Sequence, residues 1–403
     1  MSSTTNLDLL RRVDFTRLRK QRVENARRSM KKHGLDALLL VKPFYTKYLA
    51  DARGNDYVWS MWEYVLLPGD DDPFLYLVGP EAEHIKLDCP WLKGRVKPSM
   101  YMEDHGSLGK KLADDFAAEI KKQLKDARVA GSKIGMDLVN PILNRSLTEV
   151  GLSVLDGKET MMDATLIKTK DEIELLKHAA TINDSAFHRM YTTLKPGMTE
   201  WDVCAEWIYE VRRLGADTFT RGMCTSGDFA GPPLRRFMGG TNRLIKPGDL
   251  VYFDGVFSSL GYWSDYVRTY LCGGKSAGIN ATDLQKELYK ACYDLLYDSI
   301  KAVKPGNTTT DVSERWKEPE DFTEFTIQFG HGLGVSLHEY PMISFTTRKQ
   351  PVELRPGMVL ALETYASSKG AGALGVRLEE NLVVTETGCE VISKGPFDEK
   401  LTA

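Results

Sequence analysis

Two pairs of acidic residues, each pair on what reads as one β-hairpin, constrain this chain more than any other feature. The first hairpin occupies residues 248–270, with an apolar strand, a turn at residues 258–261 and an aromatic strand. If that turn is centred between its second and third residues, Asp254 lies directly opposite Asp265. Facing side chains on antiparallel strands are about 5 Å apart, where like charges repel. Two carboxylates in that position need a proton, an arginine or a metal cation between them.

A second hairpin near the C-terminus repeats the arrangement. Its strands are expected at residues 358–365 and 375–384, on either side of a glycine-rich loop. If the hairpin folds symmetrically about Ala371, Glu363 faces Glu379. Each hairpin therefore contributes one opposed pair of acids.

A histidine in a glycine-rich segment lies between the two hairpins. His331 belongs to the sequence Gly-His-Gly-Leu-Gly at residues 330–334, where the glycines let the backbone pass close to a site. Four carboxylates and one imidazole suit a pair of divalent cations such as Mn, Fe, Co or Zn, roughly 3.5–4 Å apart. The sequence therefore predicts a metal site. A satisfied core histidine is the alternative for His331.

Arginine neutralisation is the alternative for the acid pairs. Arg377 is two residues from Glu379 and therefore on its face, whereas Arg268 is on the opposite face from Asp265. Glu380 points away from Glu379 for the same reason, so we exclude it from the site.

An internal repeat indicates how the two hairpins arise. Lys-Pro-Gly-x-Thr-x-x-Asp-Val-x-x-x-Trp occurs at residues 195–207 and again at residues 304–316. Each copy predicts a Pro-Gly turn followed by a helix that begins after a threonine N-cap, with an acid three residues on. Two such copies, each after a long helix, predict an α+β domain made by duplication, with a ligand site on its pseudo-twofold axis.

The first part of the chain predicts a different architecture. Strands alternate with helices there, which is typical of a three-layer α/β domain. We place the domain boundary so that residues 1–163 form this N-terminal domain and residues 164–403 form the catalytic domain. The expected elements are a basic amphipathic helix at residues 15–33 ended by Gly34, strands at 37–41, 64–67, 74–78 and 133–137, and a helix near 108–124.

Composition excludes several classes of partner. A chain of 403 residues, 42% of them hydrophobic, can bury a full core in two domains. Its net charge of −3 gives no reason to expect nucleic acid or an anionic membrane as partner. No apolar run approaches the roughly 20 residues of a membrane-spanning helix. Residues 1–12 are polar and lack an apolar signal core, so we expect a cytoplasmic protein.

In order and spacing, these motifs resemble those of the pita-bread metalloenzymes: methionine aminopeptidase, aminopeptidase P, prolidase and creatinase. The resemblance covers nearly the whole chain, including a creatinase-type N-terminal domain, and is closest to the two-domain Xaa-Pro peptidases. The matching pieces are Asp254-x10-Asp265, Gly-His331-Gly-Leu-Gly, His338-Glu339-x-Pro341, Pro-Gly-Met-Val-Leu-Ala-Leu-Glu363 and Arg377-Leu-Glu379.

The resemblance implies two divalent metal ions, with manganese as the first expectation and iron, cobalt or zinc as alternatives. It implies Asp254 and Glu363 on separate ions, Asp265 and Glu379 bridging them, and His331 on one ion. It also implies that His338 supports a tetrahedral intermediate and that Glu363 shuttles a proton.

The implied activity is that of a Xaa-Pro aminopeptidase or dipeptidase that acts on short peptides through a metal-activated water. The implied assembly is a homodimer formed through the N-terminal domain. We expect the stretch from Trp59 to Trp62 to form part of the dimer interface.

One departure from the family concerns the substrate. Aminopeptidase P and prolidase usually carry a His-Tyr pair before the first metal strand, and here the corresponding positions hold Arg236 and Phe237. We expect Arg236, or its neighbour Arg235, to bind a substrate carboxylate through paired hydrogen bonds, and Arg377 to contact substrate as well. A surface arginine pair is the alternative.

Two further functions stay open beside the peptidase. One is a small-molecule enzyme on the same scaffold, either a C–N hydrolase or a lyase that cleaves dimethylsulfoniopropionate. Those lyases have an aspartate at the position of His338 and another two residues after the first ligand, where this chain has Val256. The other is a non-catalytic binding module, against which the complete ligand set argues.

Overall fold

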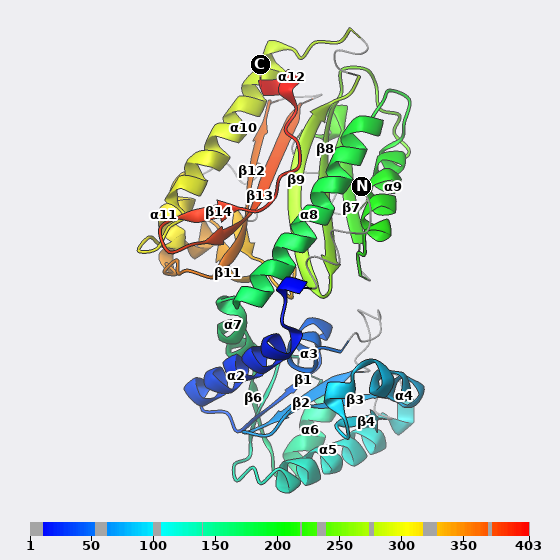
Figure 1. Cartoon of the computed structure of the whole chain (residues 1–403), viewed down its shortest axis with the longest axis vertical. Helices are drawn as coiled ribbons and strands as arrows, with labels where there is room; N and C mark the ends of the chain where they lie inside the picture. Colours follow the sequence, from blue (N-terminus) through cyan, green and yellow to red (C-terminus); the bar gives the residue numbers. More distant parts are fainter. Residues whose placement is uncertain are drawn as a thin grey trace. The chain divides into compact units, whose positions relative to one another are not determined.

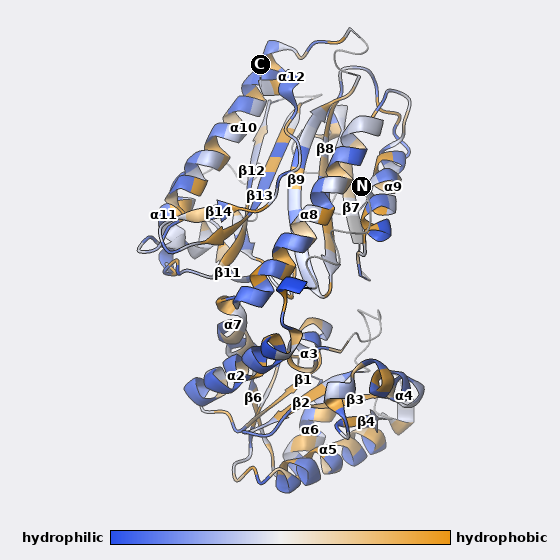
Figure 2. Ribbon diagram, viewed as in Figure 1, coloured by the Kyte–Doolittle hydropathy of each residue, from blue (hydrophilic) through white to orange (hydrophobic). Residues whose placement is uncertain are grey.

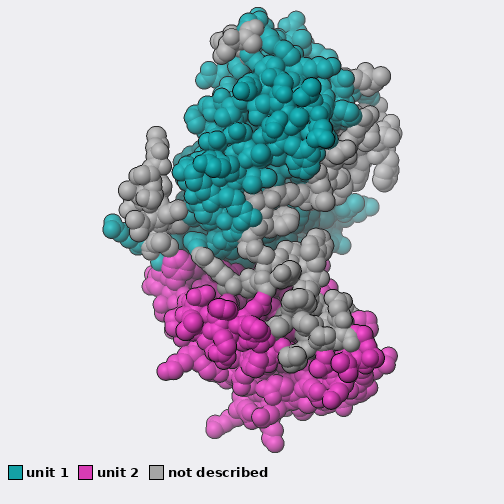
Figure 3. Space-filling view, turned by 90° about the vertical axis from the view of Figure 1, so that its right-hand side faces the viewer, with its two compact units in different colours: residues 1–13, 167–403 teal, residues 14–166 magenta. Residues whose placement is uncertain are grey.

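Two compact units make up the chain in this computed structural model. One unit comprises residues 14–166, and the other comprises residues 1–13 and 167–403 (Figure 3). The expected boundary after residue 163 falls inside a helix that ends at Leu166. The structure describes residues 11–52, 63–99, 106–138, 140–217, 220–231, 239–273, 278–316, 329–369 and 373–402.

Some predicted residues lie outside these ranges. They are Trp59 and Trp62, expected at a subunit interface, and Arg235 and Arg236, expected to bind substrate. None of the helices in the described part of the chain has the length and apolar character that crossing a bilayer requires.

The unit of residues 14–166 is a six-stranded mixed sheet in the order β4-β3-β2-β1-β5-β6. In Figure 1, α2, α3 and α7 lie on one face of this sheet and α5 and α6 lie on the other, which confirms the predicted three-layer α/β domain. Its elements are α2 (Phe15–His33), β1 (Ala37–Leu40), α3 (Pro43–Ala50), β2 (Tyr64–Pro68), β3 (Phe74–Val78), α4 (Gly79–Asp88), β4 (Val96–Ser99), α5 (Gly109–Asp126), β5 (Lys133–Met136), α6 (Pro141–Glu149), β6 (Ser153–Asp156) and α7 (Lys158–Leu166).

Local sequence signals explain the first helix of this unit. The Asp14 side chain caps α2 by accepting hydrogen bonds from two main-chain N–H groups of its first turn, and Gly34 ends it with φ 66°. A stripe of apolar residues, among them Leu18 and Ala26, is buried along α2. The rest of the helix is hydrophilic (Figure 2), so the predicted basic amphipathic helix is confirmed.

The other unit contains two antiparallel sheets. In Figure 1, α8 and α9 cover the sheet β7-β8-β9, and α10 lies against the sheet β11-β10-β12-β13-β14. This arrangement confirms the predicted α+β domain. Its elements are α8 (Lys170–Thr193), α9 (Glu200–Arg213), β7 (Thr220–Ser226), β8 (Leu250–Ser259), β9 (Tyr262–Leu271), α10 (Asp283–Ala302), α11 (Thr309–Ser313), β10 (Gly330–Gly332), β11 (Glu339–Ile343), β12 (Val359–Ser367), β13 (Gly375–Val384), β14 (Cys389–Val391) and α12 (Glu399–Thr402).

The internal repeat is visible in equivalent contacts of the two halves. Thr199 caps α9 and Thr308 caps α11, each in a reciprocal capping box with the aspartate three residues on. Each threonine also forms an isolated β-bridge to the segment before the next long hairpin. The same interval along the chain separates the counterparts of the two halves: Thr199 from Thr308, Leu244 from Glu353, and Asp254 from Glu363.

Candidate metal centre

The first hairpin places its two acids on one face, although not opposite each other. Asp254 on β8 pairs with Val267, and Asp265 on β9 pairs with Val256. The partner of Asp254 is therefore two residues further along β9 than predicted, because the two central residues of the turn are Leu260 and Gly261, both with positive φ. Side chains alternate with a period of two, so both acids still point to the same side of the sheet.

The second hairpin has the predicted register. Glu363 on β12 pairs directly with Glu379 on β13. Directly opposed carboxylates repel each other, so this pair is stable only with positive charge or protons nearby. All four acids are buried.

His331 approaches the acids from the neighbouring strand β10. Its Nδ1 lies 2.9 Å from the carbonyl oxygen of Gly332, which can only accept a hydrogen bond, so Nδ1 donates and Nε2 is left with a lone pair. Nε2 lies 3.5 Å from Asp265 Oδ2. This geometry prepares His331 Nε2 to act as a metal ligand.

The structure brings all five predicted ligands together. In each of three overlapping groups, one ligand atom per residue lies within 4.8 Å of the others. The exposed His338 joins one group, and its ring centroid is 4.4 Å from that of His331. The groups are Asp265 with His331 and His338, His331 with Glu363 and Glu379, and Asp254 with Asp265 and Glu379.

Arg377 bonds to two of the acids but leaves other buried ligand atoms without a hydrogen-bond partner in the part of the chain that the structure describes. Its guanidinium donates to Asp254 Oδ2 at 2.7 Å and to Glu363 Oε2. Five buried ligand atoms have no hydrogen-bond partner among the described residues: Asp254 Oδ1, His331 Nε2, Glu363 Oε1 and both carboxylate oxygens of Glu379. Buried polar atoms are almost always paired, and unpaired buried charge is strongly unfavourable. One guanidinium cannot balance four acids, so the residues fit divalent cations bound between the acids.

Electrostatics supports the same conclusion. Burial and the repulsion of Asp265 and Glu363 raise the pKa of Glu379 well above its ordinary value. Burial and the neighbouring carboxylates raise the pKa of Asp254 to about 8. Burial acts against ionisation of Asp265 too, but the nearby imidazole of His331 lowers its pKa. Without cations the cluster therefore retains protons, and cations that bind there displace them.

The segment that carries His338 is anchored by an ion pair that the motif analysis missed. Glu339 accepts hydrogen bonds from Lys168 Nζ at 2.7 Å and from Ser336 N at 2.9 Å. Only 2% of the Lys168 side chain and 5% of the Glu339 side chain are exposed. The two residues are far apart in sequence, so no local pattern links them. The acid directly after His338 was the available signal.

The chain matches one family model and several curated proteins. The family model described as "Metallopeptidase family M24" matches residues 174–386. The chain is 31% identical over 242 residues to "Uncharacterized peptidase YqhT" of Bacillus subtilis, covering 59% of this chain and 65% of the relative. It is 25% identical over 385 residues to a Xaa-Pro dipeptidase of Pyrococcus furiosus (93% and 98%). It is 23% identical over 419 residues to a dimethylsulfoniopropionate lyase of Roseovarius nubinhibens (96% and 88%).

Solved structures share the fold. A Xaa-Pro dipeptidase from Bacillus anthracis superimposes with a TM-score of 0.73 at 24% identity, covering 94% of this chain and 98% of that one. An X-Pro aminopeptidase from Thermotoga maritima gives a TM-score of 0.74 at 21% identity, covering 93% and 99%. The predicted combination of an α/β N-terminal domain with a pita-bread domain is confirmed.

Proposed function

Because this chain belongs to metallopeptidase family M24, we propose that it hydrolyses short peptides at the bond before a proline. We also propose that the protein binds two divalent metal ions. Manganese is the first expectation, and iron, cobalt or zinc are the alternatives. The observation that carries it is the set of unpaired buried ligand atoms on Asp254, His331, Glu363 and Glu379. The Xaa-Pro dipeptidase of Pyrococcus furiosus, which this chain matches over nearly its whole length, supports the choice of substrate.

Each ligand has a proposed role that follows from its place. Asp265, Glu379 and His331 each occur in two of the three groups of ligand atoms, whereas Asp254 and Glu363 occur in one group each. Of the three, only the two carboxylates have a second oxygen with which to bridge two ions, so we assign the bridging role to Asp265 and Glu379. His331 would hold one of the two ions through Nε2. When bound there, a pair of cations would lower the pKa of a bound water, so that hydroxide forms near neutral pH, and would polarise the scissile carbonyl.

The chain itself supplies proton transfer and charge stabilisation. Glu363 can receive the proton of the attacking water at Oε1, which accepts no hydrogen bond from the described residues, whereas Oε2 accepts from Arg377. His338 is exposed beside the ligands, where its ring can donate a hydrogen bond to the oxyanion that forms during attack. His338→Ala should therefore lower kcat more than it raises KM.

Substrate binding is assigned to arginines. Arg236 stays the proposed partner of a substrate carboxylate, and we expect Arg236→Ala to raise KM more than it lowers kcat. Arg235→Ala tests the neighbouring candidate in the same way, and an unchanged KM in Arg236→Ala would remove the role proposed for Arg236. Arg377 as a substrate contact stays a prediction, because in this structure its guanidinium is bonded to Asp254 and Glu363. The homodimer also stays a prediction.

A panel of Xaa-Pro dipeptides and tripeptides tests the function after loading with Mn²⁺ or Co²⁺. We expect cleavage that chelation abolishes and metal restores. The second candidate is a small-molecule enzyme, for which the match to a dimethylsulfoniopropionate lyase is the specific observation. If no peptide of the panel is cleaved and dimethyl sulfide is released from dimethylsulfoniopropionate, the second proposal replaces the first. Activity that survives removal of all metal would refute the first proposal.

A further inference from the structure

The two proposed bridging ligands lie on strands that face each other across a seam between two sheets. Asp265 is on β9 in the three-stranded sheet, and Glu379 is on β13 in the five-stranded sheet. The two strands are in contact, yet none of the main-chain hydrogen bonds of the described residues joins one to the other. Something other than a β-ladder must therefore hold the two halves in register behind the ligands.

Side chains bridge the seam at both ends, and they do so reciprocally. Asn381 on β13 accepts a hydrogen bond from Asp265 N at 3.1 Å and donates its Nδ2 to Asp265 O. Thr269 on β9 accepts from Arg377 N at 3.0 Å and donates to Arg377 O at 2.8 Å. Each side chain thus satisfies both main-chain groups of one residue on the other strand, as a ladder partner would.

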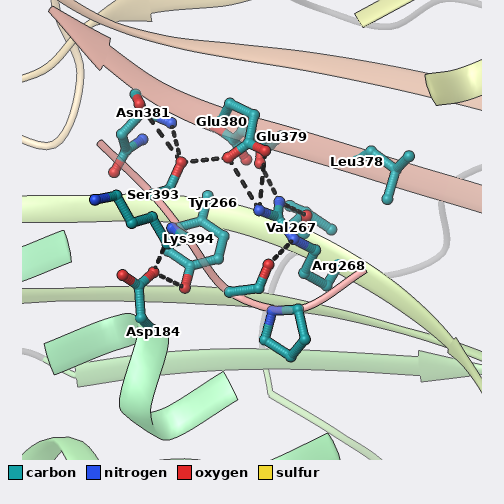
Figure 4. Close-up of polar contacts among 12 residues, drawn as sticks. Asp184, Tyr266, Val267, Arg268, Leu378, Glu379, Glu380, Asn381, Ser393 and Lys394 are labelled. Atoms are coloured by element: carbon teal, nitrogen blue, oxygen red, sulfur yellow. Dashed lines mark hydrogen bonds and ion pairs between the residues drawn. The ribbon is translucent and has the colours of Figure 1, made fainter. Parts of the chain in front are cut away.

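Arg268 crosses the middle of the seam. One of its terminal nitrogens donates to Val267 O at 3.0 Å and to Glu379 O at 2.7 Å, and the other lies 3.0 Å from both oxygens of Glu380. Figure 4 shows this guanidinium against Glu379 and Glu380, with Ser393 between Glu380 and Asn381. Arg268 therefore joins β9 to β13 on the face of the seam that points away from the ligands.

The seam has a consequence for the spacing of the ligands. Strands joined by a ladder lie about 4.8 Å apart. An amide or a hydroxyl group inserted between two main chains requires a wider separation, so Asn381 and Thr269 act as spacers. Asp265 and Glu379 project from this widened seam, and both the gap between their carboxylates and the direction of each depend on it.

We propose that Asn381 and Thr269 are positioning residues that set the separation of Asp265 from Glu379, and that this separation decides whether two cations fit instead of one. This inference rests on the metal centre of the proposed function. It goes beyond that function, since it assigns a role to two residues that contact neither substrate nor ion. Partners that orient metal ligands typically change metal affinity by about 10- to 100-fold when they are removed.

The test is a calorimetric titration of the metal-free protein with Mn²⁺, together with the paramagnetic resonance signal of a coupled Mn²⁺ pair. We expect Asn381→Leu and Thr269→Val to bind the second ion about 10- to 100-fold more weakly and to lose the coupled signal. Thr269→Ser keeps the hydroxyl and should behave as wild type. These readouts need no substrate.

Thr364→Val is the matched control. Thr364 is a buried threonine on β12 whose hydroxyl also contacts main-chain oxygens, those of Cys292 and Leu378, but it does not span the seam. Its loss should reduce thermal stability about as much as that of Thr269 while leaving both Mn²⁺ affinities as in wild type. Equal weakening in Thr364→Val would overturn the inference, because generic loss of packing would then explain the effect.

The remaining outcomes are also decisive. If Asn381→Leu does not fold, Thr269→Val compared with Thr269→Ser decides alone. Wild-type affinity for both ions in the variants would refute the role of the seam and leave the proposed function standing. If wild-type protein binds fewer than two Mn²⁺, the proposed metal centre fails, and the inference fails with it.

Discussion

The buried ion pair between Lys168 and Glu339 gives a sharp test of how the structure supports His338. Both side chains are almost fully buried, and Lys168 Nζ is 2.7 Å from Glu339 Oε2. Lys168→Met keeps the length of the side chain but leaves the carboxylate, among the residues that the structure describes, with only the main-chain N–H of Ser336 as a partner. Removing one member of a buried pair costs about 3–5 kcal/mol of unfolding free energy, because the other charge stays buried.

A double-mutant cycle separates the pair from its surroundings. Glu339→Gln alone leaves Lys168 charged and buried, whereas the double variant removes both charges. We therefore expect the double variant to lose less stability than the sum of the single variants, with a coupling of about 1–3 kcal/mol. Urea unfolding of the metal-free protein at neutral pH gives the unfolding free energy of the wild type, of both single variants and of the double variant. Because His338 directly precedes Glu339, kcat of the metal-loaded Lys168→Met variant should also fall more than KM rises.

An exposed pair of the same length provides the control. Lys177 Nζ is 2.7 Å from Glu390 Oε2, but 34% and 49% of these side chains are exposed. Lys177→Met should cost at most about 1 kcal/mol, since solvent screens such pairs. The reasoning fails if Lys168→Met costs no more than Lys177→Met, or if the two changes at Lys168 and Glu339 are additive.

Other predictions concern acid stability, metal and the first turn. Although burial opposes it, Arg22 and Lys47 lower the pKa of Asp51 to about 2. Its contribution of about 2 kcal/mol is therefore complete above about pH 4 and lost as pH falls toward 2, and Asp51→Asn should flatten this part of a plot of unfolding free energy against pH. Mn²⁺ at about 100 times its Kd should add about 2.7 kcal/mol per site to stability, and a Tm unchanged by chelation would contradict the metal centre. Leu260 has φ 53° in a two-residue turn before Gly261, so Leu260→Asn should raise stability by about 1 kcal/mol, and a lower Tm would contradict this.

Patterns of period two and local capping signals explain what the sequence could predict. The helix at Phe15–His33, the threonine caps and the register of Glu363 against Glu379 all follow from residues close together in the chain. The proximity of the four acids to His331 followed from combining these local patterns with the internal repeat.

The first hairpin shows where such patterns are insufficient. Its Ser-Ser-Leu-Gly segment suggested a turn centred between Ser259 and Leu260, whereas the structure centres the turn one residue later and gives Leu260 a positive φ, which is locally unfavourable for leucine. Pairing along the whole of β8 and β9 outweighs that local cost and moves the turn to Leu260 and Gly261. The bonds of Asn381 and Thr269 were equally hidden, since side chains that replace a β-ladder between distant segments leave no periodic signal.

Two arginines on the paired hairpins show what distinguishes a metal site from an ion pair. Arg268 and Glu380 form one pair of opposite charges, and Tyr297 and Ser393 donate to the remaining lone pairs of that carboxylate. Arg377 instead faces four acids and can bond to only two of them. The first environment is neutral and satisfied, which makes it a closed structural contact. The second keeps excess negative charge and unpaired oxygens in a buried place, and only added cations or protons can balance it. A difference in the number of facing acids therefore decides which of two similar arginines closes a seam and which borders a cation site.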